Sequence, residues 1–485
     1  MKKLIAMLLA VVMVFALCAC GSSASTTTAS TTTTETAAAP AEEEAAPAEE
    51  AAAEEGADPA SIVDTITIMV PPVSSDYVDL LNGWIADFNA TYPNITIEVI
   101  ETSWDDHNSK LSTMALAGEA PDIAEVSYSS IGSYVEMGVA VDIAQYMDLS
   151  DYDQNALDYM SLENTVYGLP LYLTIQALGG NVEMLEAAGV DVEKVQNEGW
   201  TYDEFLAAIA AGTTEGTYGF VFANAGATTS DFVNIFGVSA GINNAFTEDL
   251  KYAFTSQNML NLLTAVEDMT ASGYMPNYAV EAGQRMNMLY TGSTMITGKA
   301  MPLFEGSVNK NNAGIADGTA VEGSIEVEYA FLPVPAMDGV TASCFGSVDG
   351  MIVLRNGNYS DEHEANVCLF LDYICSGERI AAVDNELYLT CVCGSGRDAQ
   401  AAMELDQSEG NAASTARCIS LVVAPPAGIT AEQSSNANTL MTETIVPKFQ
   451  ALLAGETTAQ AMYDEICSAA FAIFGEENCE TGFIG

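Results

Sequence analysis

The sequence predicts an α/β protein with a mostly parallel sheet and more than one folded lobe. The chain has 485 residues, which is too long for one compact core. Of these residues 49% are hydrophobic, which is ample for two cores. Stretches with strand-like alternation are followed by stretches with helical spacing, and this order is typical of a parallel sheet with helices on both faces.

The N-terminus predicts an exported protein. Lys2 and Lys3 precede an apolar run from Leu4 to Leu17, which is short for a membrane span and matches the core of a secretory signal. The run ends in Leu17-Cys18-Ala19-Cys20, which resembles the bacterial lipobox. This resemblance implies a signal peptide over 1–19, a lipidated Cys20 and a place on the extracellular face of the cytoplasmic membrane.

Residues 20–60 predict a disordered linker. A Ser/Thr tract is followed by AAAPAEEEAAPAEEAAAEEGADPA, and the segment contains no aromatic residue. Such a composition cannot bury enough apolar surface to fold, and its charges and prolines keep it extended. We expect it to hold the folded body away from the membrane.

The folded body begins with a strand, a helix and a strand. Residues 65–70 (TITIMV) alternate and are β-rich, so a strand is expected there. Apolar side chains at helical spacing follow over 77–88, and this helix should stop before Pro93. The stretch 94–100 (NITIEVI) predicts the second strand.

A second helix and a third strand continue this order. Ser103 and Asp106 fit a capping box, and the helix that follows should end at Gly118. The third strand is expected over 122–127. In parallel sheets ligands bind beyond the carboxyl ends of the strands, so the loops after the three strands should form one rim of a site.

The second half of the chain shows the same alternation of expected strands and helices, but less regularly. Thr201 and Glu204 form another capping box. A strand is expected over 217–224, and a helix with an apolar stripe over 259–269 should end at Gly273.

Charge and composition exclude several function classes. Lys and Arg number 13 against 67 Asp and Glu, which gives a net charge of −54. Such a surface repels phosphate backbones and anionic lipids, so no nucleic-acid partner is expected. His107 and His363 are the only histidines, and neither lies beside a Ser or Cys that would mark a nucleophile pair, so both should lie on the surface. No metal and no cofactor is expected.

Several segments, in order, resemble the extracellular solute-binding lipoproteins of ABC importers, family 1, in its sugar-binding branch. The resemblance covers about residues 64–375 and rests on FNATYPNITIEVI, LSTMALAGEAPDIAEVS, IGSYVEMGVAVDIAQYM, YGLPLYLTIQALGGNVEMLEAAGVD, GWTYDEFLAA, MLYTGSTMITGKA and YAFLPVPAMDG.

This resemblance implies a two-lobed, periplasmic-binding-protein-like fold of type II, with each lobe discontinuous in sequence. The N-terminal lobe would comprise 61–175 and 300–375, and the C-terminal lobe 176–299 and 376–485. The chain would cross between the lobes near Leu171–Ala177, Met301–Gly306 and Asp372–Gly377. Hinge closure would trap a solute and a permease would receive it, with no bond made or broken. A monomer is expected.

The resemblance also implies a set of ligand-binding residues on the loops and crossings. These are Pro72, Val73, Trp104, Tyr128, Ser129, Tyr172, Asn224, Asp231, Phe304, Glu305 and Asp349. Each has a structural alternative: Trp104 could pack at a helix start, Tyr172 and Phe304 could pack at the hinge, and Asp349 could be a turn residue. The carbohydrate ligand, an oligosaccharide by preference, is the favoured interpretation.

Two departures from the family pattern keep other ligands open. Gly179-Gly180-Asn181 stands where the family often has Tyr-Tyr-Asn, and a Gly-x-Trp is missing after Met301. A polyamine, a peptide or another small solute remains an alternative, as does a surface adhesin. An enzyme is not expected, because the consecutive Asp105 and Asp106 of a helix cannot flank one glycosidic bond.

Eight cysteines lie between Cys344 and Cys479. Export permits disulfides, but free buried thiols are the favoured interpretation. Cys391 and Cys393 flank one residue and should not bond to each other.

Overall fold

The computed structural model describes residues 58–74, 76–225, 228–403 and 407–485. The expected signal peptide, Cys20 and all but the last residues of the linker lie outside the described residues. Residues 57–485 form one compact unit. Within the described ranges no helix is both long and apolar enough to cross a membrane.

The first half of the sheet contains the three strands that the sequence predicts. Its order is β2 (Ile95–Glu101), β1 (Asp64–Val70), β3 (Ile123–Ser127), β10 (Phe345–Val353) and β6 (Gly168–Asn181). Strand β1 is parallel to β2 and β3, as expected, whereas β10 is antiparallel to β3 and β6. The sheet is therefore mixed.

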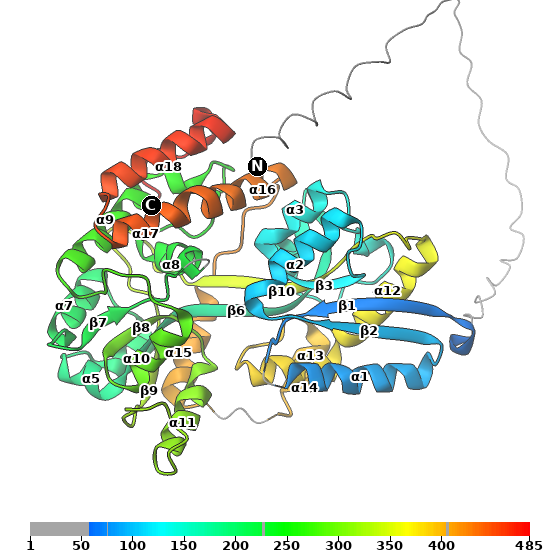
Figure 1. The fold of residues 1–485 in the computed structure, drawn as a ribbon, viewed down its shortest axis with the longest axis horizontal. Coiled ribbons are helices and arrows are strands. Elements are labelled where there is room, and N and C mark those ends of the chain that lie inside the picture. The colour runs from blue at the N-terminus through cyan, green and yellow to red at the C-terminus, as the bar shows by residue number, and fades with distance from the viewer. Residues whose placement is uncertain (1–57, 75, 226–227, 404–406) are drawn as a thin grey trace, which may run out of the picture. The chain divides into compact units, whose positions relative to one another are not determined.

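Strand β6 continues into a second half of the sheet. Its first part pairs with β10, and its last residues pair with β8 (Thr294–Ala300) on one side and β9 (Tyr329–Leu332) on the other. Strand β7 (Tyr218–Val221) is parallel to β8 and lies at the edge of this half. In Figure 1, β6 and β10 run side by side through the middle of the described structure.

The helices cover these two halves. Those beside the first half are α1 (Tyr77–Thr91), α2 (Trp104–Ala117), α3 (Ile131–Glu136), α4 (Gln154–Tyr159), α12 (Asp361–Ile374), α13 (Gly377–Glu386) and α14 (Gly394–Gln400). Those beside the second half are α5 (Val182–Ala187), α6 (Val192–Glu198), α7 (Tyr202–Gly212), α8 (Thr228–Gly237), α9 (Gln257–Ala271), α10 (Ala282–Tyr290), α11 (Phe304–Ile315), α15 (Glu409–Ser420), α17 (Val446–Leu453) and α18 (Ala459–Phe474). Helix α16 (Ala431–Leu440) packs on α3 and leads through a π-helical turn, Met441–Ile445, into α17.

Successive side chains of strand β1 point to opposite faces of the sheet and are buried in a core on each face. Ile66 and Ile68 belong to the cluster that α1 and α12 cover. Met69 points to the opposite face and packs with Ala124 and Val126. Burial on both faces is typical of a sheet with helices on each side.

The predicted helix ends are confirmed where the sequence carries caps. The Ser103 hydroxyl accepts a hydrogen bond from the Asp106 amide, and Gly118 ends the helix at a φ of 73°. Thr201 and Glu204 form both hydrogen bonds of a capping box at the start of α7. These short polar side chains satisfy amides that have no partner within the helix.

The connections between the two halves differ from those expected. Strand β6 pairs with strands of both halves, in the region where the first crossing is expected. However, β9 pairs with the end of β6, so residues 301–306 stay beside the second half. Arg397 of α14 binds Asp153 with an N–O distance of 2.6 Å, which keeps the segment after residue 377 beside the first half. The described chain instead crosses at 333–344 and at 421–430, and α14 beside the first half is followed by α15 beside the second.

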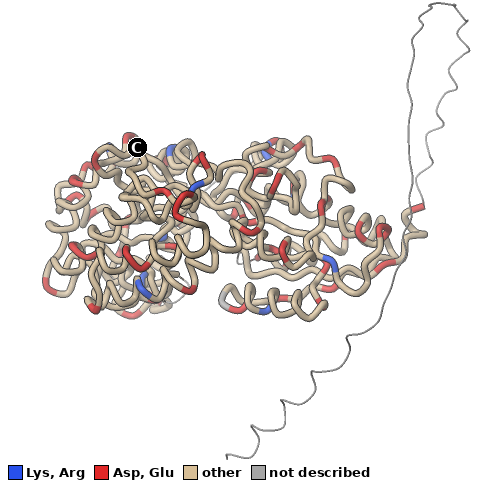
Figure 2. The backbone as a smooth tube through the Cα atoms, turned by 90° about the horizontal axis from the view of Figure 1, so that it is seen from above, with Lys and Arg blue, Asp and Glu red and all other residues tan. Residues whose placement is uncertain are grey.

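Acidic residues are spread over both halves. Figure 2 shows Asp and Glu positions along the whole backbone of the described body, with few Lys and Arg positions among them. The charge therefore belongs to the folded surface as well as to the linker.

The surface placement expected for both histidines is wrong. His107 is 3% exposed, and its ring nitrogens contact the Thr102 hydroxyl at 2.6 Å and the Glu125 carbonyl at 2.7 Å. The His363 ring on α12 lies between Asp64 of β1, at 2.9 Å, and Asp122, at 3.1 Å. His363 thus ties α12 to the sheet.

We predict that His363 makes stability fall as the pH rises above neutrality. Burial lowers the pKa of His363, but the hydrogen bonds and charges of Asp122 and Asp64 outweigh burial and raise it. A raised pKa gives a contribution that is complete below the unfolded value, about 6.5, and is lost as the pH rises through the folded value. His363→Asn should therefore be destabilised most at pH 5.5–6. Urea unfolding of both proteins from pH 5.5 to 8.5 measures this difference, and a constant difference would contradict the prediction.

Candidate functional site

A cavity of about 320 Å³ opens between the two halves of the body. Its walls come from four places: the loop after β3 with α4, the hairpin of β4 (Ser161–Leu162) and β5 (Thr165–Val166), helix α8 with the loop that follows it, and the stretch that leads into α16. The lining residues are Tyr128, Ser129, Gln154, Asp158, Tyr159, Ser161, Leu162, Glu163, Asn164, Val166, Ser230, Asn234, Ile242, Asn243, Asn244, Ala245, Phe246, Phe254, Phe345, Pro425, Pro426, Ala427, Gly428, Ile429, Ser434, Ala437, Asn438, Met441 and Thr442.

The cavity is lined mainly by neutral polar and aromatic side chains. Five asparagines contribute carboxamides, and two tyrosines and three phenylalanines contribute rings. Asp158 and Glu163 carry the only charges among the lining residues, which include no Lys, Arg or His. A surface of this kind can hydrogen-bond neutral hydroxyl groups and stack on apolar ring faces. It offers nothing to neutralise an anion.

Two tyrosines form the aromatic corner of the cavity. The rings of Tyr128 and Tyr159 meet edge to face, with centroids 5.0 Å apart and planes at 87°. Burial, helped by the charge of Asp349, raises the pKa of Tyr128 to about 12, so its hydroxyl stays protonated. The Tyr159 side chain is 5% exposed, and its hydroxyl has no hydrogen-bond partner within the described structure. A buried hydroxyl without a partner is costly, and a ligand oxygen in the cavity could relieve that cost.

Hydrogen bonds fix several of the polar side chains before any ligand arrives. Asn243 accepts from the Ser343 hydroxyl at 2.6 Å, and Asn244 donates to the Ala424 carbonyl at 3.0 Å. Gln154 donates to the Asp158 carboxylate at 2.8 Å. Contacts of this kind hold polar groups in one orientation and reduce the entropy lost on binding.

The tip of the β4–β5 hairpin carries two residues in the left-handed backbone region. Glu163 has a φ of 51° and Asn164 a φ of 66°. Asparagine adopts this region readily, whereas glutamate rarely does. The two-residue turn places both residues on the cavity wall.

The structure places Tyr128 and Ser129, two of the eleven residues expected from the sequence, on the cavity wall. Asp231 follows the lining residue Ser230 at the start of α8 and forms an ion pair with Lys299 at the end of β8. Lys299 has a φ of 52°, an uncommon conformation for a side-chain-bearing residue.

Tyr172 and Asp349 lie opposite each other on β6 and β10. The Tyr172 hydroxyl donates to the Glu125 carboxylate at 2.8 Å, and both residues are buried. Burial raises the pKa of Asp349 to about 7, although a hydrogen bond with Ser127 and the charge of Lys299 oppose the rise. Asp349 is therefore a residue of strand β10 and not a turn residue. The charges of Asp231 and Lys299, from the other half, act on its pKa.

Pro72, Val73 and Trp104 lie together at the loops after β1 and β2. The Trp104 indole donates to the Pro72 carbonyl at 3.0 Å, and 51% of Trp104 is exposed. Val73 packs against the core. None of the three lines the cavity, and the exposure of Trp104 is at odds with a packing role at the helix start.

The remaining expected residues are engaged in structural contacts. The Asn224 carboxamide accepts from the Val280 amide at 2.8 Å. Phe304 faces the Arg285 guanidinium, which lies 5.3 Å from its ring centroid. Glu305 is buried and accepts from the Ser408 amide at 3.1 Å.

Sequence reasoning missed most of the cavity wall, especially the C-terminal residues 425–442. The turn sequence Pro425-Pro426-Ala427-Gly428 and the capping box of Thr430 and Gln433 would have located this stretch before α16. Nothing in it marks a ligand contact, because the contact depends on how α16 packs on α3. Among the described residues no group of three or more His, Cys, Asp or Glu could hold a metal ion.

Comparison with known proteins places the chain in a family. The model of the family described as bacterial extracellular solute-binding protein matches residues 74–376. The chain belongs to this family. It is accordingly a solute-binding protein and not an enzyme.

Relatives and solved structures agree with this assignment. The solute-binding protein is 26% identical over 147 residues to an uncharacterised lipoprotein of Streptomyces antibioticus, covering 30% of this chain and 32% of the relative. It is 24% identical over 205 residues to the maltodextrin-binding protein MdxE of Bacillus subtilis, covering 39% of this chain and 46% of that relative. The chain thus spans less than half the length of these curated relatives.

The fold is that of two-lobed solute-binding proteins. The GacH receptor of Streptomyces glaucescens, which was solved unliganded and with acarbose, superposes with a TM-score of 0.66. The two chains are 17% identical, and the match covers 86% of this chain and all of the receptor. The two-lobed α/β fold expected from the sequence is confirmed.

Proposed function

We propose that this solute-binding protein captures a neutral oligosaccharide in the cavity between its lobes and delivers it to an ABC permease. The observation that carries the proposal is the cavity lining, which combines six carboxamides, five from Asn and one from Gln, with aromatic rings and has no cationic side chain. Sugars expose hydroxyl groups at the ring edge and C–H groups on the ring face, and this lining offers partners for both.

The unpartnered Tyr159 hydroxyl and the size of the cavity support the same ligand class. The Tyr159 hydroxyl has no protein partner in the described structure, and a polyol in the cavity would supply one. A volume of about 320 Å³ leaves room for more than one sugar ring. The relative MdxE is a maltodextrin-binding protein, and GacH was solved with acarbose.

Hinge closure is the proposed mechanism of capture. The cavity has walls from both sides of the crossing strand β6, so a ligand that contacts both walls favours the closed state. We propose lobes that follow the strand pairing, with β9 in the C-terminal lobe and α13 and α14 in the N-terminal lobe.

The anchor and the partner belong to the same proposal. Lipidation of Cys20 at the extracellular face of the cytoplasmic membrane would keep the protein near its permease. The lipobox-like sequence Leu17–Cys20 supports this, as does the similarity to a lipoprotein of Streptomyces antibioticus. The linker would then let the body reach the permease.

A cationic solute is the second candidate ligand, because Asp158 and Glu163 line a cavity without cations. A thermal-shift screen of neutral oligosaccharides, polyamines and peptides separates the two candidates. A ligand at a hundred times its Kd adds about 2.7 kcal/mol to the free energy of unfolding. A rise in Tm with maltodextrins or another neutral saccharide supports the proposal, and a rise with spermidine alone overturns the ligand class.

We predict that the aromatic corner carries much of the affinity. Tyr128→Ala removes a ring from the cavity wall and should weaken saccharide binding about 10–100-fold. Tyr159→Phe removes only the unpartnered hydroxyl and should weaken it by a smaller factor. Tyr278→Ala is the matched control, because Tyr278 is 42% exposed and lies outside the cavity. Titration calorimetry measures each Kd, and an unchanged affinity in Tyr128→Ala would exclude the corner from the site.

A further inference from the structure

Two of the cysteines meet although they lie far apart in the sequence. Cys344 lies in the connection 333–344 that leads from β9 to β10, and Cys418 lies in the last turn of α15. Both are free thiols, with exposed fractions of 3% and 0%.

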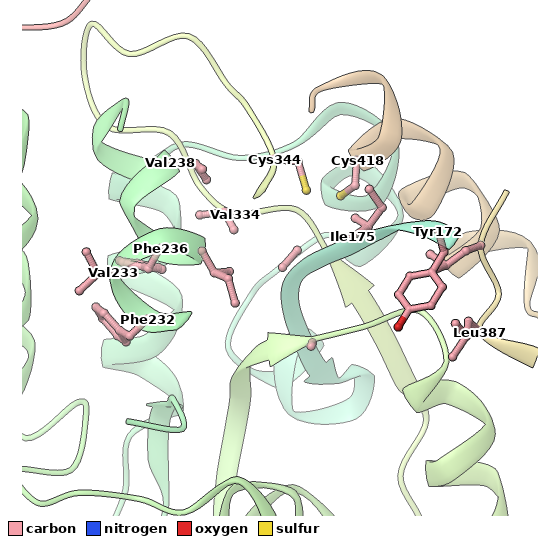
Figure 3. Packing of buried hydrophobic residues seen from close by; sticks show 14 of the residues in the cluster. Tyr172, Ile175, Phe232, Val233, Phe236, Val238, Val334, Cys344, Leu387 and Cys418 are labelled. Atoms are coloured by element: carbon pink, nitrogen blue, oxygen red, sulfur yellow. The ribbon is translucent and has the colours of Figure 1, made fainter. Parts of the chain in front are cut away.

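Backbone contacts bring the segments that carry Cys344 and Cys418 together. The Cys344 amide donates to the Leu421 carbonyl at 3.0 Å, and Cys344 forms a parallel bridge with Val422. The Leu421 amide donates to the Cys418 carbonyl at 3.1 Å, so the turn after α15 brings Cys418 back toward Cys344. The Cys344 thiol also lies 3.9 Å from the Gln176 carbonyl and 3.6 Å from the Phe345 carbonyl. Figure 3 shows the sulfur atoms of Cys344 and Cys418 between their two segments.

Two other thiols have different contacts. Cys393 contacts the Ser395 hydroxyl at 3.9 Å, and the Cys391 thiol interacts with the Asp384 carboxylate. Cys344 and Cys418 differ from these thiols in their position, because Cys344 ends one connection between the halves and Cys418 lies just before another.

We propose that Cys344 and Cys418 are a redox modification site that a low-molecular-weight disulfide oxidises to an intramolecular disulfide. In the first step the thiolate of one cysteine attacks a sulfur of the oxidant, and one small thiolate leaves. In the second step the thiolate of the other cysteine attacks the protein sulfur of the mixed disulfide, and the second small thiolate leaves. The two protein thiols lose two protons, which the two released thiolates take up, and the oxidant is reduced to two thiols.

The location gives this bond a structural consequence. Connection 333–344 crosses from the second half of the sheet to the first, and residues 421–430 cross again immediately after Cys418. A disulfide would tie these two crossings together and close a long loop, which restricts the unfolded chain. This inference does not depend on the identity of the ligand.

Burial makes the native pair slow to react. The hydrogen bond with Cys418 and burial both raise the pKa of Cys344 well above its usual range, so this thiol is protonated in the folded protein. The oxidant should act while the chain folds or opens. The experiment therefore supplies the oxidant during refolding.

The test refolds the full chain from urea, in one sample with oxidised and reduced glutathione and in another with a phosphine reductant. Peptide mapping without reduction should find the peptides of Cys344 and Cys418 joined, with a mass 2 Da below their sum. The oxidised protein should melt about 2–5 °C above the reduced one. Cys344→Ser and Cys418→Ser should each abolish the linked peptide and the shift, and Cys344→Ala serves if the serine variant does not fold.

Cys368→Ser is the matched control, because Cys368 is buried on α12 away from both crossings. It should keep both the linked peptide and the shift. If Cys344 and Cys418 are both alkylated as free thiols after refolding with glutathione, or are linked to other cysteines, the proposed site is overturned.

Discussion

Gly298→Ala is expected to lower the free energy of unfolding by about 3 kcal/mol, because strand β8 has no space for a side chain at this position. A Cβ built on Gly298 would lie 1.8 Å from a ring carbon of Phe222. Phe222 is fully buried and packs against Phe220 and Phe232, so it cannot move aside without disturbing its neighbours.

The position of Gly298 gives this variant a second effect. Its carbonyl accepts from Arg285 at 2.8 Å, and Lys299, the partner of Asp231, follows it in the chain. Displacing the strand should disturb both contacts at the edge of the second lobe. The Cβ built on Gly83 of α1 meets nothing within 4 Å, so Gly83→Ala should instead stabilise by about 0.5–1 kcal/mol. Urea unfolding of the three proteins compares them, and equal stabilities for both variants would contradict the packing described here.

Asp384→Asn is expected to raise the free energy of unfolding at pH 7.5 by about 2–4 kcal/mol. Asp384 is fully buried on α13, and burial raises its pKa to about 8. The neighbouring Cys391 thiol lowers the pKa only in part, because a thiol is a weak hydrogen-bond donor. The folded protein therefore keeps a proton on this carboxyl that the unfolded chain loses near pH 4.

The sign of the pH dependence follows from these two pKa values. Between about pH 4 and pH 8 the folded state binds one more proton at Asp384 than the unfolded state, so the free energy of unfolding falls as the pH rises. Asparagine removes this loss, and the gain should vanish below pH 4.5. Asp398→Asn on the neighbouring helix α14 is the matched control, because Asp398 is exposed. Denaturant unfolding at pH 4.5 and 7.5 measures the effect, and a gain of equal size at both values would rule out titration of Asp384 as its cause.

The sequence predicted best the features that depend on neighbouring residues. Strand β1, helix α1 and strand β2 appear where alternation and helical spacing place them, and Gly118 and Thr201 mark helix ends because their contacts lie within one turn. The antiparallel insertion of β10 and the pairing of β9 with the end of β6 depend on contacts between distant segments. No local pattern encodes these pairings, and the expected crossings near residues 301–306 and 372–377 differ from the structure for this reason.

The candidate site also contains some residues that local sequence predicts and others that it does not. Tyr128 and Ser129 follow the carboxyl end of a correctly predicted parallel strand, and both line the cavity. Phe304 and Glu305 are expected at a crossing, but in the structure Phe304 packs beside Arg285 and Glu305 accepts a hydrogen bond from the Ser408 amide. Asn438 of α16 and Met441 of the following π-helical turn also line the cavity. They do so because α16 packs on α3, about 300 residues earlier in the chain, and local sequence does not encode that contact.

Hydrogen exchange of the protein with and without a saturating neutral oligosaccharide shows whether the ligand binds in this cavity. We expect added protection in the stretches that line the cavity, namely 158–166, 230–246 and 425–442, together with the loop at Tyr128. We expect no added protection around α18, which does not line the cavity. Protection confined to α18, or to the exposed Trp104 and its loop, would show that the ligand binds elsewhere and that the cavity is not the site.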